Sequence, residues 1–506
     1  MIVWLVLIGI VAYFIVRQSV SGITRASVWV LWLVMMAPAL IWTTWTLANG
    51  PGQPVPPWLA LPPFIACPLL YVWLVQQGRS ARPQQSTHGD LESPISVLAD
   101  PSSPAEALAL AQALGSAKIS PRLLDRTEEA SLQDCFPWSV FYLSSVEHRP
   151  QAALCYGQLR AEPALAYRTV CDKIRQKFSD RFLVIFQEGQ NGKPFFALVP
   201  NPKRTPLGQA LSQEPPLWKQ VVWSVGLLGL SLLSMTLMGA EMLRNPKLDL
   251  VRDWAFIQSG APYAIGLLLV LGAHELGHYW AAKRHRVSVS LPLFIPIPAL
   301  LGTLGAFTPL RSPMPHRRAM FDVGFWGAIG GLLVALPLLI WGLAHSTVVN
   351  PLPGSGLLNW RSIDPSYSIA LTLISKATLG AALVPGKAIA LHPIALAGYI
   401  GLWLGAFHLL PLGSLDGGRI VRAMLGTQGA MLVGHITRFA VLVLALARSE
   451  FLALALLVFF LPAISQPALD DVTPLDDRRD GLGFLALALL VLVVLPAPRL
   501  LLSWLS

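Results

Sequence analysis

The sequence predicts a polytopic α-helical membrane protein with a small α+β soluble domain inserted before the main group of membrane spans. Of its 506 residues, 54% are hydrophobic and only 13% are charged, which is far from the composition of an average soluble domain. Several apolar runs reach the length of roughly 20 residues with which a helix crosses a bilayer. About ten spans are expected, near 2–16, 28–48, 58–76, 220–240, 261–282, 319–344, 393–412, 429–447, 450–465 and 482–504.

A polar segment at 78–218 separates the first three spans from the others. Its first part, 79–134, is rich in Pro, Ser, Gln and Ala, so we expect part of it to be a linker. One helical stretch is expected near 104–115. The folded part is expected at 136–200, around an amphipathic helix at 163–178. Four strands complete this α+β module, at 139–143, 152–159, 182–186 and 194–199. The chain therefore divides into N-terminal membrane helices (1–77), the soluble segment (78–218), the membrane core (219–465) and a C-terminal loop with a membrane helix (466–506).

The charge distribution indicates a membrane topology and not a nucleic-acid partner. The net charge is +10, but Lys and Arg lie largely in short loops beside apolar runs, as the positive-inside rule expects. Arg79 and Arg82 follow the third span, and Lys203 and Arg204 precede the fourth. We therefore place the soluble domain on the cytoplasmic or stromal side. The same rule puts the basic run 283–286 on that side, close to the end of the 261–282 span.

The sequence H-E-L-G-H at 274–278 lies inside the apolar run 261–282. On a helix, residues four apart share one face, so His274 and His278 can hold a single metal ion. Glu275 is placed where its carboxylate can reach a water on that metal, as in zinc proteases. The alternative is a polar face of a soluble helix, but the apolar neighbours argue against it, because ionisable groups at membrane depth are costly and usually functional.

A catalytic zinc needs a third protein ligand and one open position for water. The best candidate is Asp416, which follows an apolar span and is followed by Gly417 and Gly418. These glycines allow the backbone to bend or to pack closely against a neighbour. Alternatively, Asp416 caps the helix that begins near Gly417, because Asp is a favoured N-cap residue. The residues alone leave both roles open.

The pair of motifs resembles the site-2 protease family of intramembrane zinc metalloproteases, over roughly residues 136–465. The soluble module and the segments 391–398 and 409–418 look like the plastid and cyanobacterial branch of that family. The resemblance implies one Zn²⁺ per chain, on His274, His278 and Asp416, with Glu275 as the base. It also implies an endopeptidase that cleaves the transmembrane segments of other membrane proteins. The expected location is a cyanobacterial plasma or thylakoid membrane or a plastid membrane, with the active site near the cytoplasmic or stromal face.

Three further residues are candidates for binding substrate. The family has Asn in N-x-x-P-x-x-x-L-D, where this chain has His408; the resemblance implies that this position helps to hold substrate or the transition-state oxygen. A His can still donate a hydrogen bond, so the role can survive with an altered pH dependence. Alternatively, activity is reduced or the substrate differs. His408 as a fourth metal ligand is less favoured, because it would close the open position. Gly302 and Gly305 follow a proline-rich apolar stretch at 291–299, which predicts a hairpin or re-entrant loop. In the family this G-x-x-G element resembles an edge strand that receives substrate; the alternative is a loop that only packs the bundle.

Two functions from other classes compete with proteolysis. A non-catalytic relative could bind membrane proteins as a chaperone or assembly factor, but loss of Glu275 or of a ligand would be expected there, and all are present. A transporter would favour paired sites along a pore, whereas the sequence contains one cluster.

A zinc ion shared by His274 and Asp416 also restricts the number of membrane crossings between these two residues. Asp416 must return to the depth of His274 through 393–412, so the apolar segment 366–391 is not expected to be a further full crossing.

Overall fold

The computed structural model describes residues 27–49, 126–149, 152–189, 192–201, 216–242, 254–297, 301–351, 362–384, 386–451 and 465–498, with isolated residues elsewhere. The chain forms two compact units, Met1–Ile119 with Val441–Phe460, and Ser120–Ala440 with Leu461–Ser506. In the first unit, the expected span at 28–48 is helix α2 (Val28–Asn49). The expected spans at 2–16, 58–76 and 450–465 and the helical stretch near 104–115 lie largely or wholly outside the described residues.

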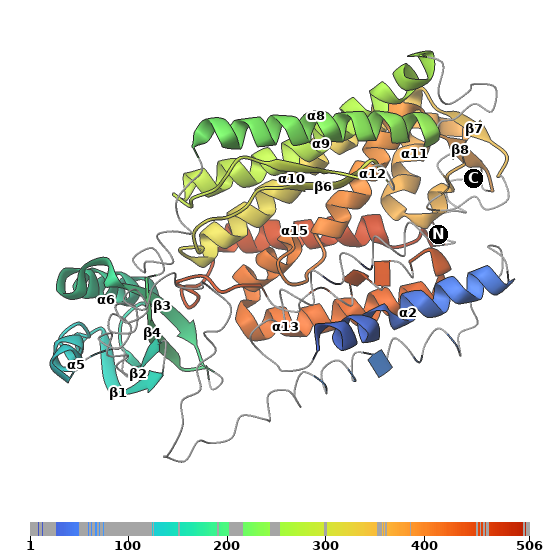
Figure 1. The fold of residues 1–506 in the computed structure, drawn as a ribbon. Helices are drawn as coiled ribbons and strands as arrows, with labels where there is room; N and C mark the ends of the chain where they lie inside the picture. The colour runs from blue at the N-terminus through green and yellow to red at the C-terminus, as the bar shows by residue number, and fades with distance from the viewer. Residues whose placement is uncertain are drawn as a thin grey trace, which may run out of the picture. The chain divides into compact units, whose positions relative to one another are not determined.

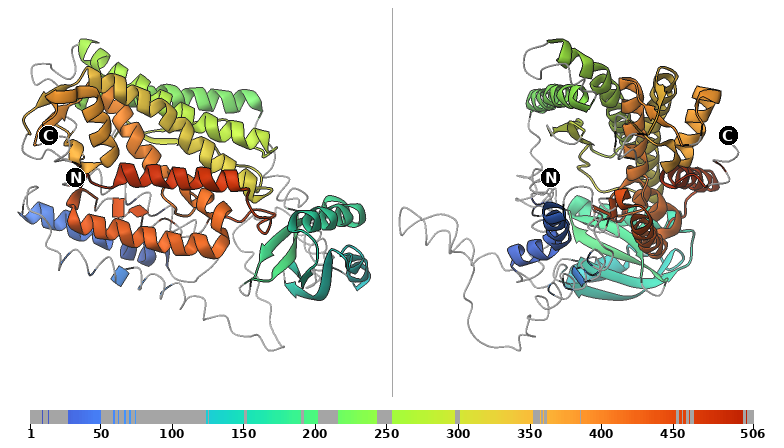
Figure 2. Two further views of the ribbon diagram at one scale, coloured as in Figure 1. Left: turned by 180° about the vertical axis from the view of Figure 1, so that it is seen from behind. Right: turned by 90° about the vertical axis from the view of Figure 1, so that its right-hand side faces the viewer.

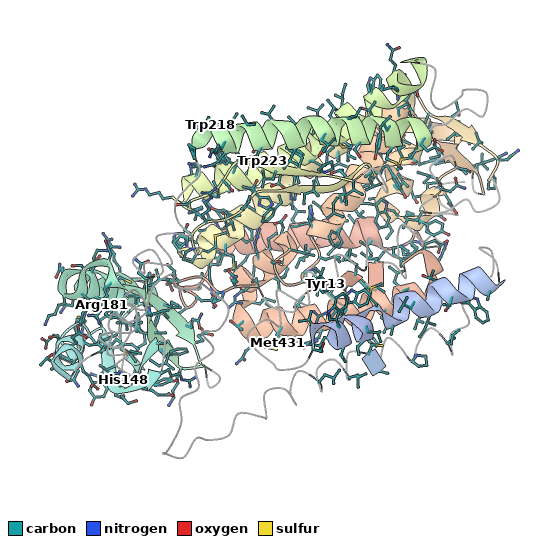
Figure 3. The ribbon with its side chains drawn as sticks, viewed as in Figure 1. Tyr13, His148, Arg181, Trp218, Trp223 and Met431 are labelled. Carbon is teal, nitrogen blue, oxygen red and sulfur yellow. The ribbon has the colours of Figure 1, made fainter. Side chains whose placement is uncertain are left out.

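Four helices among the described residues are long and apolar enough to cross a membrane. They are α8 (Leu217–Met242), α9 (Trp254–Arg284), α10 (Arg317–Ala344) and α13 (Asp416–Ala447). Helices α8, α9 and α10 run side by side, as two further directions of view also show (Figures 1 and 2). Trp218 and Trp223 project from α8 and are 64% and 69% exposed, which suits a position near a membrane–water boundary (Figure 3). The count of about ten spans stays a prediction for the chain as a whole.

The expected hairpin forms from β5 (Leu293–Pro296) and β6 (Thr303–Phe307), an antiparallel pair with an irregularity at Ile295 and Pro296. Gly302 has φ +83°, and a Cβ there would lie 2.4 Å from the Cα of Met235 on α8. The hairpin therefore packs directly on α8.

The segment between α10 and α12 (Pro393–His408) starts and ends at the same end of the core. Strand β7 (Thr347–Val349) follows α10 and pairs antiparallel with β8 (Ala388–Ala390), which precedes α12. The helix between them, α11 (Ile369–Leu379), has only 11 residues. This agrees with the prediction that 366–391 does not make a full crossing.

The soluble module is a four-stranded antiparallel sheet with strand order β1-β2-β4-β3. Its elements are α5 (Arg126–Gln133), β1 (Phe141–Arg149), β2 (Ala152–Leu159), α6 (Pro163–Phe178), β3 (Phe182–Glu188) and β4 (Pro194–Pro200). The four strands and the helix α6 confirm the sequence-based assignment. Leu124 and Leu132 are also buried in the core of this module, so its folded part reaches upstream of residue 136.

Residues 469–471 connect this module to the membrane core. The Phe186 N–H of β3 donates to the Leu469 carbonyl at 2.6 Å, and the Asp471 N–H donates to the Phe186 carbonyl at 2.9 Å. On the other side, the Leu469 N–H donates to the carbonyl of Met314, just before α10, at 2.8 Å. The backbone of one short segment thus pairs with both parts.

The carboxylate of Asp471 strengthens this connection from a buried position. It accepts from Arg422 Nη2 of α13 at 2.9 Å and forms an ion pair with Arg317 Nε of α10 at 3.4 Å. A buried charge is tolerated when it is paired in this way. The soluble module is therefore tied to the beginnings of α10 and α13, the two helices that border the site described next.

Candidate metal centre and active site

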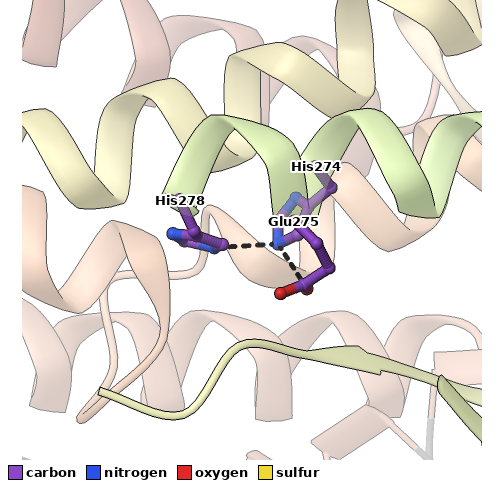
Figure 4. Close-up of side chains that lie close together, drawn as sticks. All are labelled: His274, Glu275 and His278. Carbon is purple, nitrogen blue, oxygen red and sulfur yellow. Dashed lines mark hydrogen bonds and ion pairs between the residues drawn. The ribbon is translucent and has the colours of Figure 1, made fainter. Parts of the chain in front are cut away.

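Helix α9 places its three motif residues together in the interior of the membrane core (Figure 4). The Nε2 atoms of His274 and His278 are 3.1 Å apart, because residues four apart lie above one another on a helix face. The Oε1 atom of Glu275 is 3.9 Å from His274 Nε2. All three side chains are buried. The structure thus brings the predicted ligands and the predicted base into one group.

Asp416, the first residue of α13, completes the group from a second helix. Its Oδ2 atom is 3.4 Å from His274 Nε2 and 3.3 Å from His278 Nε2. Tetrahedral zinc with bonds of about 2.0–2.2 Å separates its ligand atoms by about 3.3–3.6 Å. The three observed separations lie close to this range, and two imidazoles with one carboxylate are a donor set that zinc prefers. Asp416 therefore both begins helix α13 and lies at the candidate metal centre.

The polar atoms of the site lack the hydrogen bonds that buried groups normally make. Asp416 Oδ2 faces the Nε2 atoms of both histidines at 3.3 and 3.4 Å, and Glu275 Oε2 is buried without a well-directed hydrogen bond. The Nε2 atoms of His274 and His278 face each other at 3.1 Å, where either a shared proton or a metal ion can lie between them. A cation bound by His274, His278 and Asp416 would satisfy these groups, so the residues present fit a zinc ion.

Glycines on one face of α10 make room for the site. A Cβ on Gly327 would lie 2.2 Å from Cε1 of His278, and one on Gly331 would lie 3.2 Å from Cβ of His274. A Cβ on Gly324 would lie 2.9 Å from the Asp416 carbonyl. These glycines were not among the residues predicted from the sequence to form the site. Their spacing of three and four, typical of close helix contacts in membranes, is the signal that could have found them.

Replacement of Gly327 by Ala is expected to weaken zinc binding by at least about 10-fold, the lower bound for losing support of a ligand. The added methyl would overlap the His278 ring and force it out of the triangle with His274. Zinc affinity of the purified variant, measured by chelator competition, checks this. Gly272→Ala is the matched control on α9, because a Cβ there meets nothing within 4 Å. Equal affinities for the two variants would contradict the assigned position of His278.

The residues predicted to bind substrate lie in two places. His408, the last residue of α12, lies beside His274 with 4.3 Å between ring centroids and the rings tilted by 33°. His274, His408 and Asp416 also offer ligand atoms within 4.8 Å of one another. Gly305 lies within β6 at φ +117° with nothing near its Cβ position, whereas Gly302 packs against α8. Thus His408 joins the cluster, and the two glycines shape the hairpin.

Comparison with known proteins identifies two parts of the chain. Residues 262–447 match Peptidase family M50, and residues 130–206 match the EGY3 middle domain. The chain is 28% identical to "Probable zinc metalloprotease EGY2, chloroplastic" of Arabidopsis thaliana over 385 residues, 75% of this chain and 66% of that protein. It is 29% identical to "Probable zinc metalloprotease EGY1, chloroplastic" of the same plant over 409 residues, 75% of this chain and 73% of the relative.

A more distant relative is "Probable zinc metalloprotease EGY3, chloroplastic" of Oryza sativa subsp. indica, 27% identical over 48% of this chain and 43% of that protein. The chain thus spans just under two thirds of the Arabidopsis EGY2 protein and less than half of this one. No solved structure matches. Since the matched region 262–447 contains His274, Glu275, His278 and Asp416, the chain carries a domain of Peptidase family M50, the site-2 protease family, and is a homologue of the plastid EGY proteins.

Proposed function

We propose that this protein is a zinc-dependent intramembrane endopeptidase that cleaves transmembrane segments of membrane proteins. The observation that carries the proposal is the triangle of His274 Nε2, His278 Nε2 and Asp416 Oδ2, with sides of 3.1, 3.3 and 3.4 Å, on two helices of membrane-spanning length. The Peptidase family M50 match over the same helices supports it.

The chain would hold one zinc ion on His274, His278 and Asp416. A zinc ion there supplies Lewis-acid chemistry, since it makes a water more acidic and polarises a scissile carbonyl. Glu275 accepts the proton of the attacking water and returns it to the leaving amine. Its carboxylate suits this task, because it is buried beside the metal triangle, with Oε1 3.9 Å from His274 Nε2.

The hairpin supports a membrane-protein segment as the substrate. In the described part of the chain, β6 pairs with no strand other than β5, so its other edge has no strand partner. Leu304 and Phe307 on this strand are 47% and 55% exposed. A helical segment shields its own peptide bonds, whereas a segment paired with a strand edge is extended and open to attack. We assign substrate binding to Gly305 in this strand and to Gly302 in the turn before it, and we assign His408 to the substrate carbonyl.

The site would lie near the cytoplasmic or stromal face of a plastid membrane, or of a cyanobacterial plasma or thylakoid membrane. His278 is six residues, or about 9 Å of helix, from Arg284 at the end of α9. Lys283 and Arg284 end that helix, as expected for a cytoplasmic end. The plant relatives are named as chloroplastic.

Purified protein in lipid vesicles is expected to cut a labelled transmembrane peptide within its apolar segment. Cleavage should stop with a zinc chelator and return when zinc is added back. Fragment masses locate the cut, and cuts confined to the polar flanks would contradict an intramembrane site. Zinc-loaded protein that binds the peptide without cutting it would instead favour a chaperone or assembly factor.

Replacement of His408 by Asn is expected to keep one zinc per chain and to keep or raise the cleavage rate. Asn can donate the same hydrogen bond to the substrate carbonyl, and three ligands remain for the metal. Zinc content and initial cleavage rate measure the two effects. Loss of zinc in this variant would show that His408, whose ring lies beside that of His274, is a ligand.

A further inference from the structure

Arg419 contacts the metal centre from behind one of its ligands. It lies three residues after Asp416 on the first turn of α13, and its Nη1 atom is 3.2 Å from Asp416 Oδ1. The other carboxylate oxygen, Oδ2, faces the Nε2 atoms of His274 and His278. The two oxygens of Asp416 therefore have different partners.

The start of α13 is held tightly enough to keep this arrangement. A Cβ on Gly417 would lie 1.9 Å from the carbonyl oxygen of Leu409, so the helix start packs directly on the turn before it. A Cβ on Gly324 of α10 would lie 3.3 Å from Cβ of Arg419. The backbone that carries both residues of the ion pair thus packs closely on its neighbours.

The pair is also shielded from solvent. The side chains of Asp416 and Arg419 are 4% and 22% exposed. Exposed pairs contribute little because water and salt screen them, but a buried carboxylate depends on its partner. A single hydrogen bond from Arg419 also occupies the oxygen that would otherwise be free to turn toward the metal.

We infer that Arg419 is a positioning residue that holds Asp416 as a ligand through one oxygen only. The inference rests on the proposed function. By engaging Oδ1, the guanidinium fixes the rotation of the carboxylate and presents Oδ2 to the ion. It also prevents both oxygens from binding, which preserves the open position that a catalytic zinc needs for water.

The test measures zinc affinity and coordination in the purified full chain. Arg419→Gln is expected to weaken zinc binding by about 10- to 100-fold, the usual effect of removing the partner of a ligand. With Co²⁺ in place of zinc, the visible absorption should weaken, because a two-oxygen carboxylate raises the coordination number. Arg419→Lys, which keeps the charge and so protects folding, should recover most of the affinity.

Two controls separate this role from a general loss of charge or of stability. Arg318→Gln removes a half-exposed arginine at the start of α10, 3.9 Å from Asp476, and should leave zinc affinity unchanged. In an Asp416→Asn background, Arg419→Gln should cause little further loss, because the arginine acts through Asp416.

Unchanged affinity and an unchanged cobalt spectrum in Arg419→Gln would overturn the inference if Asp416→Ala still loses zinc. Zinc retained by Asp416→Ala would overturn the ligand assignment of the proposed function, and this inference with it. The two failures are therefore distinguishable.

Discussion

Replacement of Glu275 by Gln is expected to lower the cleavage rate by about 10²- to 10⁴-fold, the usual contribution of general acid–base catalysis. Gln has the size and shape of Glu but cannot accept the proton of the attacking water. The zinc content should stay at one ion per chain, because none of the three atoms that form the metal triangle belongs to Glu275. Initial cleavage rates in lipid vesicles and zinc content by elemental analysis measure the two effects.

A neighbouring substitution provides the control. Leu276 is 62% exposed on the same turn of α9, so Leu276→Ala should keep both zinc and cleavage. Full cleavage by the Glu275→Gln protein would move the base to another group. Loss of zinc in that protein would mean that Glu275 helps to hold the metal.

The parts of the site that the sequence predicted depend on local geometry. His274 and His278 are four residues apart on one helix, so their Nε2 atoms meet wherever the helix is placed. The hairpin β5–β6 was likewise predictable, since the prolines at 292, 296 and 298 oppose a regular helix and the glycines favour a turn.

The role of Asp416 needed the tertiary structure. A carboxylate before two glycines suits a helix cap and a metal ligand equally well, and only the packing of α13 beside α9 decides which atoms it faces. In the structure Asp416 is the first residue of α13 and not its N-cap, because the Arg419 N–H donates to the carbonyl of Leu415. One oxygen of the Asp416 carboxylate contacts Arg419, and the other faces the two imidazoles.

Helix α13 also begins earlier than the span expected at 429–447. It runs from Asp416 to Ala447, with a non-helical break at Gly426, where φ is +69° and ψ is −167°. The apolar pattern reveals the part after this break, whereas the polar and glycine-rich first turns carry no membrane signal. Those turns are the part that contributes Asp416 and Arg419.

Contacts between distant segments were outside the reach of sequence patterns. Residues 469–471 lie in a stretch that was expected to be a loop, yet they pair with β3 and with the segment before α10. The pairing of Asp471 with Arg317 and Arg422 joins residues 154 and 49 positions apart. No periodicity within either segment specifies such a partner.

His278→Ala and Asp416→Ala are expected to bind zinc more than about 100-fold more weakly and to lose all measurable cleavage. Removal of a ligand should exceed the roughly 10- to 100-fold cost of removing the partner of a ligand. Each change leaves two of the three converging atoms, too few for a stable catalytic zinc.

His435→Ala is the matched control, because His435 is exposed on α13, the helix that carries Asp416. Chelator competition gives the affinities, and vesicle cleavage gives the rates. Zinc bound at full affinity by Asp416→Ala would move the third ligand elsewhere. His408 would be the first candidate, because its ring centroid lies 4.3 Å from that of His274.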